Sequence, residues 1–222
     1  MDALFGIKTE NETILVTSRN FARGISIMNH QDRKYIMISD KIAMGIVGEA
    51  GDTAHFAAYI KANVKLYENS FAQLPTISFK DGEVASDADE KNDEEHVLST
   101  KNIANFVRLE LAKSLRSRKP YQVNLVIAGA DGDLYMIDYL GTMVKQPYVV
   151  QGYAAFYAMS LLDHHYRTNL SEEEGIELAK MCLKEINLRM PASVGDVDIV
   201  VLSKTKAPRQ FIIADKDLRK SI

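Results

Sequence analysis

Apolar residues at the start of the chain come in short runs that polar turns separate. Leu4–Lys8 precedes the polar turn Thr9–Glu12, and the β-branched run Thr13–Thr17 follows it. Tyr35–Ile38 and Ile42–Val47 form a second pair around another polar break. Runs of this length and composition are typical of buried strands. The pattern therefore predicts four strands in two neighbouring pairs.

The period of the apolar residues then changes. Phe56, Ile60, Val64 and Tyr67 recur every three or four positions, as one face of a helix does. Asp52 stands just before this face, where a residue that caps a helix is expected. We therefore predict a helix that Asp52 caps.

An acidic segment at 74–96 interrupts this order. Its part Asp81–His96 carries eight acidic residues, one lysine and almost no large apolar residue. Such a segment cannot offset its ordering entropy by burial. We expect a mobile surface insertion, and an acidic recruitment segment is the alternative.

A second helix is predicted over Thr100–Arg118, because apolar residues fall on one side of it and Pro120 ends it. Strands resume with Val123–Ala128, and an Asp-Gly pair at 131–132 makes a hairpin turn into Leu134–Asp138. The pattern thus returns from helix to sheet.

Two further helices follow. The third is predicted over Tyr153–His165, and the fourth begins at Ser171, where Ser171 and Glu174 match a capping box, and stops at Pro191. Strand-like runs flank this helix pair at Tyr148–Val150, Asp198–Leu202 and Gln210–Ile213. Strands in runs and helices in pairs argue against alternating βαβ units. We predict an α+β fold of two antiparallel sheets faced with helix pairs, in a single domain over 1–222.

Composition narrows the function classes. The formal net charge of −3 gives no general attraction for nucleic acid or for anionic membranes. No apolar run approaches membrane-spanning length, and the first six residues lack the basic and apolar regions of a secretory signal. With Cys182 as the single cysteine, we expect a soluble protein of a reducing intracellular compartment.

Two groups of residues invite a chemical interpretation. His164 and His165 are neighbours, but residues i and i+1 do not share a helix face and a spaced third ligand is not evident. Helix-end packing is therefore favoured over a metal site. Cys182 falls on the apolar face of the fourth helix, which favours a core residue over a nucleophile.

Two loops are also candidates. Gly48–Asp52 joins a strand to a helix and could cradle an anion, but it lacks the Lys-Ser/Thr ending of a P-loop, so a tight turn is favoured. The basic run Arg116–Lys119 lacks interleaved aromatic residues. A solvated helix end, or a contact with a partner's acidic residues, is favoured there over nucleic-acid binding.

Three stretches together resemble beta-type subunits of the 20S proteasome. They are Ser18-Arg19, Val47–Thr53 with the helix that follows, and Leu115–Asn124 with Tyr135–Leu140. Gly152-Tyr153, Leu161–Tyr166 and Arg189–Pro191 extend the resemblance over nearly the whole chain, except the acidic insertion. Within the family, the resemblance is greatest to the beta type-2 subunit at the fourth position of the beta ring.

The resemblance implies a four-layer α-β-β-α sandwich of the N-terminal-nucleophile hydrolase type. Active members cleave peptide bonds with an N-terminal threonine, whose hydroxyl attacks the carbonyl while its own amine moves the proton. A lysine lowers local proton affinity, and two aspartates and a serine orient the site.

These roles carry over onto this chain only in part. The place of the nucleophile falls at or near Met1, that of the first aspartate at Thr17 and that of the second near Met190. Lys34 matches the lysine, and Ser193 matches the serine. Methionine cannot be activated as an alkoxide, so the resemblance implies a degenerate site without catalytic residues.

Processing at an internal position is the alternative to a missing nucleophile. Gly141-Thr142 is the one Gly-Thr pair and lies in the sheet region, whereas a cut before Thr9 would delete the first strand. We therefore expect a non-catalytic structural subunit. An active threonine peptidase with unrecognised processing is the alternative, and a binding module with an anion site at Gly48–Asp52 is a third interpretation.

The family resemblance also implies partners and a location. It implies assembly with other alpha and beta subunits into a 28-subunit, four-ring particle for ATP- and ubiquitin-dependent protein degradation. It implies the cytoplasm and the nucleus, and neither a cofactor, a metal, nucleic acid nor a membrane among the binding partners.

Overall fold

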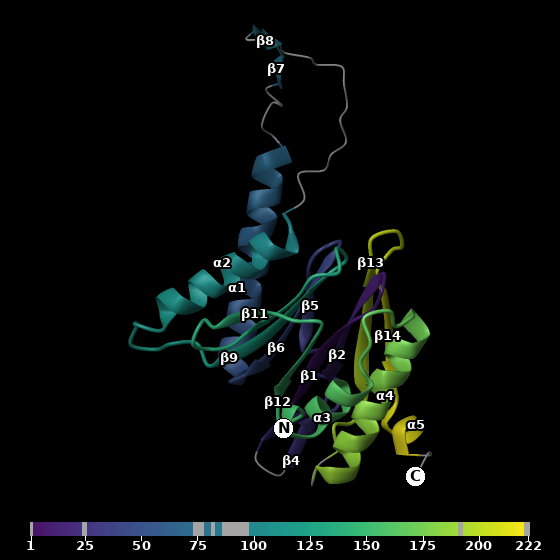
Figure 1. The fold of residues 1–222 in the computed structure, drawn as a ribbon. Helices are drawn as coiled ribbons and strands as arrows, with labels where there is room; N and C mark the ends of the chain where they lie inside the picture. Colours follow the sequence, from purple (N-terminus) through teal and green to yellow (C-terminus); the bar gives the residue numbers. More distant parts are fainter. Residues whose placement is uncertain are drawn as a thin grey trace.

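The computed structural model describes residues 2–23, 26–72, 78–80, 83–85, 98–190 and 193–219. Two five-stranded antiparallel sheets stack face to face, and each carries a pair of helices on its outer face (Figure 1). The four layers of helix, sheet, sheet and helix confirm the predicted α+β sandwich.

The first sheet has the strand order β12-β1-β2-β13-β14. Its strands are β1 (Ala3–Lys8), β2 (Glu12–Ser18), β12 (Tyr148–Gly152), β13 (Val197–Ser203) and β14 (Arg209–Ile213). Helices α3 (Ala155–His165) and α4 (Glu172–Arg189) pack on this sheet, and the short helix α5 (Asp215–Arg219) follows β14.

The second sheet has the order β11-β10-β9-β6-β5. Its strands are β5 (Tyr35–Ser39), β6 (Ile42–Gly48), β9 (Val123–Gly129), β10 (Leu134–Ile137) and β11 (Met143–Lys145). Helices α1 (Ala50–Ala72) and α2 (Thr100–Ser114) cover it. A separate apolar cluster, with Leu4, Leu15, Val126 and Val200 among its members, fills the space between the two sheets.

Two hairpins stand outside these sheets, and the sequence pattern predicted neither. β3 (Phe21–Arg23) pairs with β4 (Ser26–Asn29), and β7 (Ser78–Lys80) pairs with β8 (Glu83–Ala85). The second hairpin lies within the acidic insertion predicted at 74–96, whose remaining positions fall outside the described residues.

The predicted helices are present with changed ends. The capping box of Ser171 and Glu174 is confirmed at the start of α4. α2 ends at Ser114 rather than Arg118, because the chain goes into a turn there, in which the N–H of Ser117 donates to the carbonyl of Ser114. Asp52 lies inside the first turn of α1, and its Oδ2 accepts from the backbone N–H of Gln122 at 3.0 Å, so its prediction as the helix cap was wrong.

Candidate functional site

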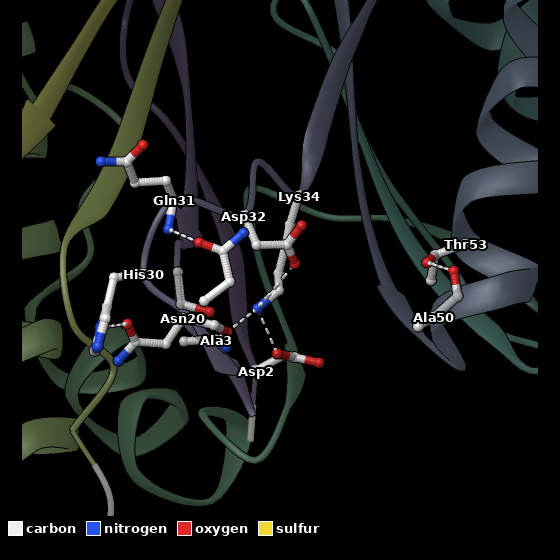
Figure 2. Close-up of polar contacts among 11 residues, drawn as sticks. Asp2, Ala3, Asn20, His30, Gln31, Asp32, Lys34, Ala50 and Thr53 are labelled. Carbon is white, nitrogen blue, oxygen red and sulfur yellow. Dashed lines mark hydrogen bonds and ion pairs between the residues drawn. The ribbon is translucent and has the colours of Figure 1, made fainter. Parts of the chain in front are cut away.

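Lys34 is a buried cation immediately before β5. Its Nζ lies 2.7 Å from Oδ1 of Asp2 and 3.8 Å from Oδ2 of Asp32, and it also donates to the backbone carbonyl of Asn20 (Figure 2). Only 7% of Lys34 is exposed. The side chain is therefore held by two carboxylates and a carbonyl oxygen, and its ammonium group is already engaged in the folded chain.

Asn20 connects Lys34 to Ser193. Its carbonyl accepts from Lys34, while its Nδ2 donates to the backbone carbonyl of Ser193 at 3.1 Å. Its Oδ1 lies 2.9 Å from Nδ1 of His30 (Figure 2). Sequence analysis missed Asn20, and the signal available was an asparagine shortly after the strand-like run Thr13–Thr17.

Ser193 lies in the loop between α4 and β13. Its Oγ donates to Oδ1 of Asp215 at 2.9 Å and accepts from the backbone N–H of Gly195 at 3.0 Å. Gly195 has φ +71°, and a Cβ there would lie 2.3 Å from the side chain of Asn20. The serine hydroxyl thus shapes this loop and bonds to α5.

Thr17 and Met190 make no hydrogen bond to Lys34 within the described residues. Thr17, in β2, is fully buried, and its Oγ1 has no hydrogen-bond partner among the described residues. Met190 caps the C-terminal end of α4 and packs into the core beneath α3 and α4. Of the five predicted site positions, the structure connects Lys34 with Ser193 through Asn20, and Met1 lies outside the described residues.

A cavity of about 390 Å³ opens beside Lys34. Asp2, Asp32 and Lys34 form a charged wall, while Ile36, Ile46 and Ala57 supply apolar lining. A mixed lining of this kind suits a side chain or a short peptide segment better than a free ion.

Gly48 and Ala50 of the Gly48–Asp52 turn also line this cavity. Gly48 has φ +148°, and a Cβ there would lie 2.1 Å from the carbonyl oxygen of Gln122. The Asp52 carboxylate points at the Gln122 N–H, so the turn already holds an anionic group of its own. Close backbone approach explains the glycine without an anion ligand.

The remaining candidates have local roles. Cys182 is fully buried in the core, as predicted, and burial raises the pKa of its thiol to about 12. His164 and His165 are exposed at the end of α3 with their rings edge to face, and no group of three or more potential metal ligands occurs in the described part of the chain. Among the same residues, no helix combines the length and hydrophobicity needed to cross a bilayer.

The two threonines considered for processing lie in turns. Thr9 is buried in the β1–β2 turn, where its Oγ1 donates to the Glu12 carbonyl at 3.0 Å. Thr142 is exposed in the turn between β10 and β11, and its N–H donates to Asp138 at 2.8 Å.

Comparisons with known proteins cover most of the chain. A family model described as "Proteasome subunit" matches residues 2–88 and 83–202. "Proteasome subunit beta type-4" of Saccharomyces cerevisiae is 41% identical over 209 residues, which span 92% of this chain and 94% of that protein. "Probable proteasome subunit beta type-4" of Meyerozyma guilliermondii is 42% identical over 92% of this chain and 96% of that protein. "Proteasome subunit beta type-2" of Dictyostelium discoideum is 32% identical over 87% and 89%, respectively.

Proposed function

Since this chain belongs to the proteasome subunit family as a beta-type member, we propose that it is a non-catalytic structural subunit of the 20S core particle. In this role, it forms one domain that contacts other alpha and beta subunits and helps to enclose the chamber for ATP- and ubiquitin-dependent degradation, in the cytoplasm and the nucleus. Relatives carry type-2 and type-4 names, and its place at the fourth position of the beta ring is part of this proposal.

The Lys34–Asp2 ion pair carries the proposal. An ammonium group that is not shared with a carboxylate exerts its full charge on a nearby nucleophile. Here, the ammonium group is 2.7 Å from a carboxylate and also bonds to the Asn20 carbonyl. Thr17 supplies a neutral hydroxyl at the place where the resemblance implies an acid. These contacts support a structural rather than a catalytic role for Lys34 and Thr17.

The surface supports a role in assembly. Large apolar side chains remain exposed on several elements, including Phe156 at 80%, Met28 at 64% and Leu188 at 61%. Exposed apolar groups in number are expected on a protein that buries them against partners. The basic run Arg116–Lys119 is exposed as well, which suits a contact with acidic residues of a neighbour.

The proposal is tested on 20S particles purified with this subunit tagged. Native mass measurement of the particles is expected to find the chain in a 28-subunit assembly. A covalent threonine-directed probe is expected to label other beta subunits and leave this one unlabelled. Labelling of this chain, or its recovery from cells only as a free monomer and not in particles, would overturn the proposal.

An active threonine peptidase with unrecognised processing is the second candidate, and the cavity beside Lys34 favours it. N-terminal sequencing of the chain taken from particles separates the two. An exposed N-terminal Thr, Ser or Cys next to this cavity supports the peptidase, and any other terminus supports the structural subunit.

A further inference from the structure

Thr17 and Asp198 face each other inside the molecule. They are directly paired residues of the antiparallel strands β2 and β13, and their exposed fractions are 0% and 4%. The next inward pair on these strands, Leu15 and Val200, belongs to the core between the two sheets. Because side chains alternate along a strand, Thr17 and Asp198 point into the same space.

A close contact with the opposite sheet supports this placement. Cγ2 of Thr17 lies 3.4 Å from the position that a Cβ on Gly45 of β6 would take. The Thr17 side chain therefore reaches the facing sheet, which leaves little room for expansion around it.

The side chains of Thr17 and Asp198 lie in the same buried space, and Arg19 is the close counter-ion there. Nη1 of Arg19 lies 3.0 Å from Oδ1 of Asp198. The other carboxylate oxygen of Asp198 and the hydroxyl oxygen of Thr17 have no hydrogen-bond partner within the described residues. Directly opposed residues on paired strands have Cβ atoms about 4.5–5.5 Å apart. A charge on either residue would therefore act on Arg19.

We propose that the paired positions 17 and 198 together accommodate a single carboxylate. In this chain, Asp198 of β13 supplies that carboxylate, and it positions Arg19. Arg19 in turn holds the segment that leads to Lys34. Its backbone N–H donates to the carbonyl of Asp196, and its carbonyl accepts from the N–H of Asp32. Asp198 is thus a positioning residue that acts on Lys34 through Arg19.

The charges around Asp198 are compatible with one carboxylate at positions 17 and 198 and disfavour a second. Burial raises the pKa of Asp198, and the guanidinium groups of Arg19 and Arg33 offset this in part, while Asp196 adds to it. Tyr35 faces the same groups from β5. A second carboxylate directly opposite Asp198 adds like-charge repulsion in a desolvated space. One of the two acids would then be neutral or the strands would separate.

The test compares Thr17→Asp with Thr17→Asn, which has the same shape without the charge, each with Asp198 or with Asp198→Asn. Every variant is produced as the only copy of this subunit, and its incorporation into 20S particles is measured by native mass. We expect Thr17→Asp to lower incorporation about tenfold and Thr17→Asn to stay within about twofold of the wild type. We expect Thr17→Asp/Asp198→Asn to recover to at least the level of Asp198→Asn alone.

The pH dependence of particle stability distinguishes an effect of charge at position 17 from an effect of packing. The temperature at which Thr17→Asp particles dissociate is expected to fall further below that of the wild type at pH 8 than at pH 5, because protonation of one acid relieves the repulsion. The proposal is overturned if Thr17→Asn is as defective as Thr17→Asp, if the double variant is no better than Thr17→Asp, or if the defect does not depend on pH. These comparisons are relative to wild-type particles, so failure of the proposed function would show separately, as an absence of the wild-type chain from them.

Discussion

At the scale of single residues, buried charges are held by partners from distant parts of the chain. Lys34 pairs with Asp2, and Asp198 pairs with Arg19, at 2.7 and 3.0 Å. Arg19 and its neighbour Asn20 link the two pairs, because Asn20 bonds to Lys34 through its carbonyl. Removal of one charge should therefore affect stability more than an ordinary surface substitution does.

Asp2→Ala tests this expectation. It leaves the buried ammonium group of Lys34 with one carbonyl and a carboxylate 3.8 Å away, so we expect the free energy of unfolding to fall by about 1–3 kcal/mol. Urea unfolding of the full chain measures the change. Asp32→Asn is the matched control, since this longer and more exposed ion pair should contribute less than about 1 kcal/mol. Equal losses in both variants would show that the Asp2 contact is not special.

The reactivity of Cys182 is a second residue-scale expectation. Its thiol is fully buried and its pKa is raised to about 12, so almost no thiolate forms at pH 8. Iodoacetamide followed by mass spectrometry should leave the native chain unmodified and should alkylate the chain in denaturant. Rapid alkylation under native conditions would mean that α4 opens far more readily than its packing indicates.

The sequence indicated only part of this residue-scale chemistry. It marked Lys34 and Ser193, because their types match a pattern. It did not mark Asn20 or Asp2 as their partners, since Asn20 and Ser193 are 173 positions apart in the chain and meet only when β2 pairs with β13. Met190, which the resemblance sets near the place of the second aspartate, packs into the apolar core beneath α3 and α4.

At the scale of elements, the junction between β6 and α1 contains two glycines, Gly48 and Gly51, and its backbone geometry requires only Gly48. Gly48→Ala adds both a strained φ and a clash with the Gln122 carbonyl, so we expect a loss of roughly 2–5 kcal/mol in unfolding free energy. Gly51→Ala, in the first turn of α1, meets no atom within 4 Å and should stabilise the helix by up to about 1 kcal/mol.

Thermal or urea unfolding of the two full-length variants distinguishes them. If Gly48→Ala were tolerated as well as Gly51→Ala, the close approach of β9 and β6 at Gln122 would not be needed for the fold. That outcome would return the turn to its interpretation as an anion cradle.

The sequence predicts an element well where apolar residues repeat at helical spacing over a long stretch or where a specific capping motif is present. The four long helices have apolar faces, and α4 has a capping box that sequence alone identifies. β3 and β4 were missed because they are short and β4 is exposed along its whole length, so there is no alternation to read. α5 has only five residues and no apolar face of its own.

At the scale of the whole molecule, exposed apolar groups distinguish this chain from a self-sufficient monomer. Phe156, near the start of α3, is 80% exposed. Burial of such a side chain at an interface contributes about 1.5–3 kcal/mol, whereas its exposure contributes little to the fold. Its substitution should therefore separate assembly from folding.

We expect Phe156→Ser to lower incorporation into particles about tenfold or more while the thermal midpoint of the unassembled full chain stays within about 2 °C. Native mass and thermal unfolding measure the two quantities. Ser160→Ala, on the same helix and also exposed, is the control and should change neither. Unchanged incorporation of Phe156→Ser would remove α3 from the candidate contacts.

The pairing of β1 and β2 with late strands also has a consequence for synthesis on the ribosome. The second sheet is complete once β11 has emerged, at residue 145. The first sheet must wait for β12 and β13, because β1 pairs with Tyr148–Gly152 and β2 with Val197–Ser203. Until then, both outer edges of the β1–β2 hairpin remain unpaired. The earliest strands of this chain are thus among the last to be paired along both edges during synthesis.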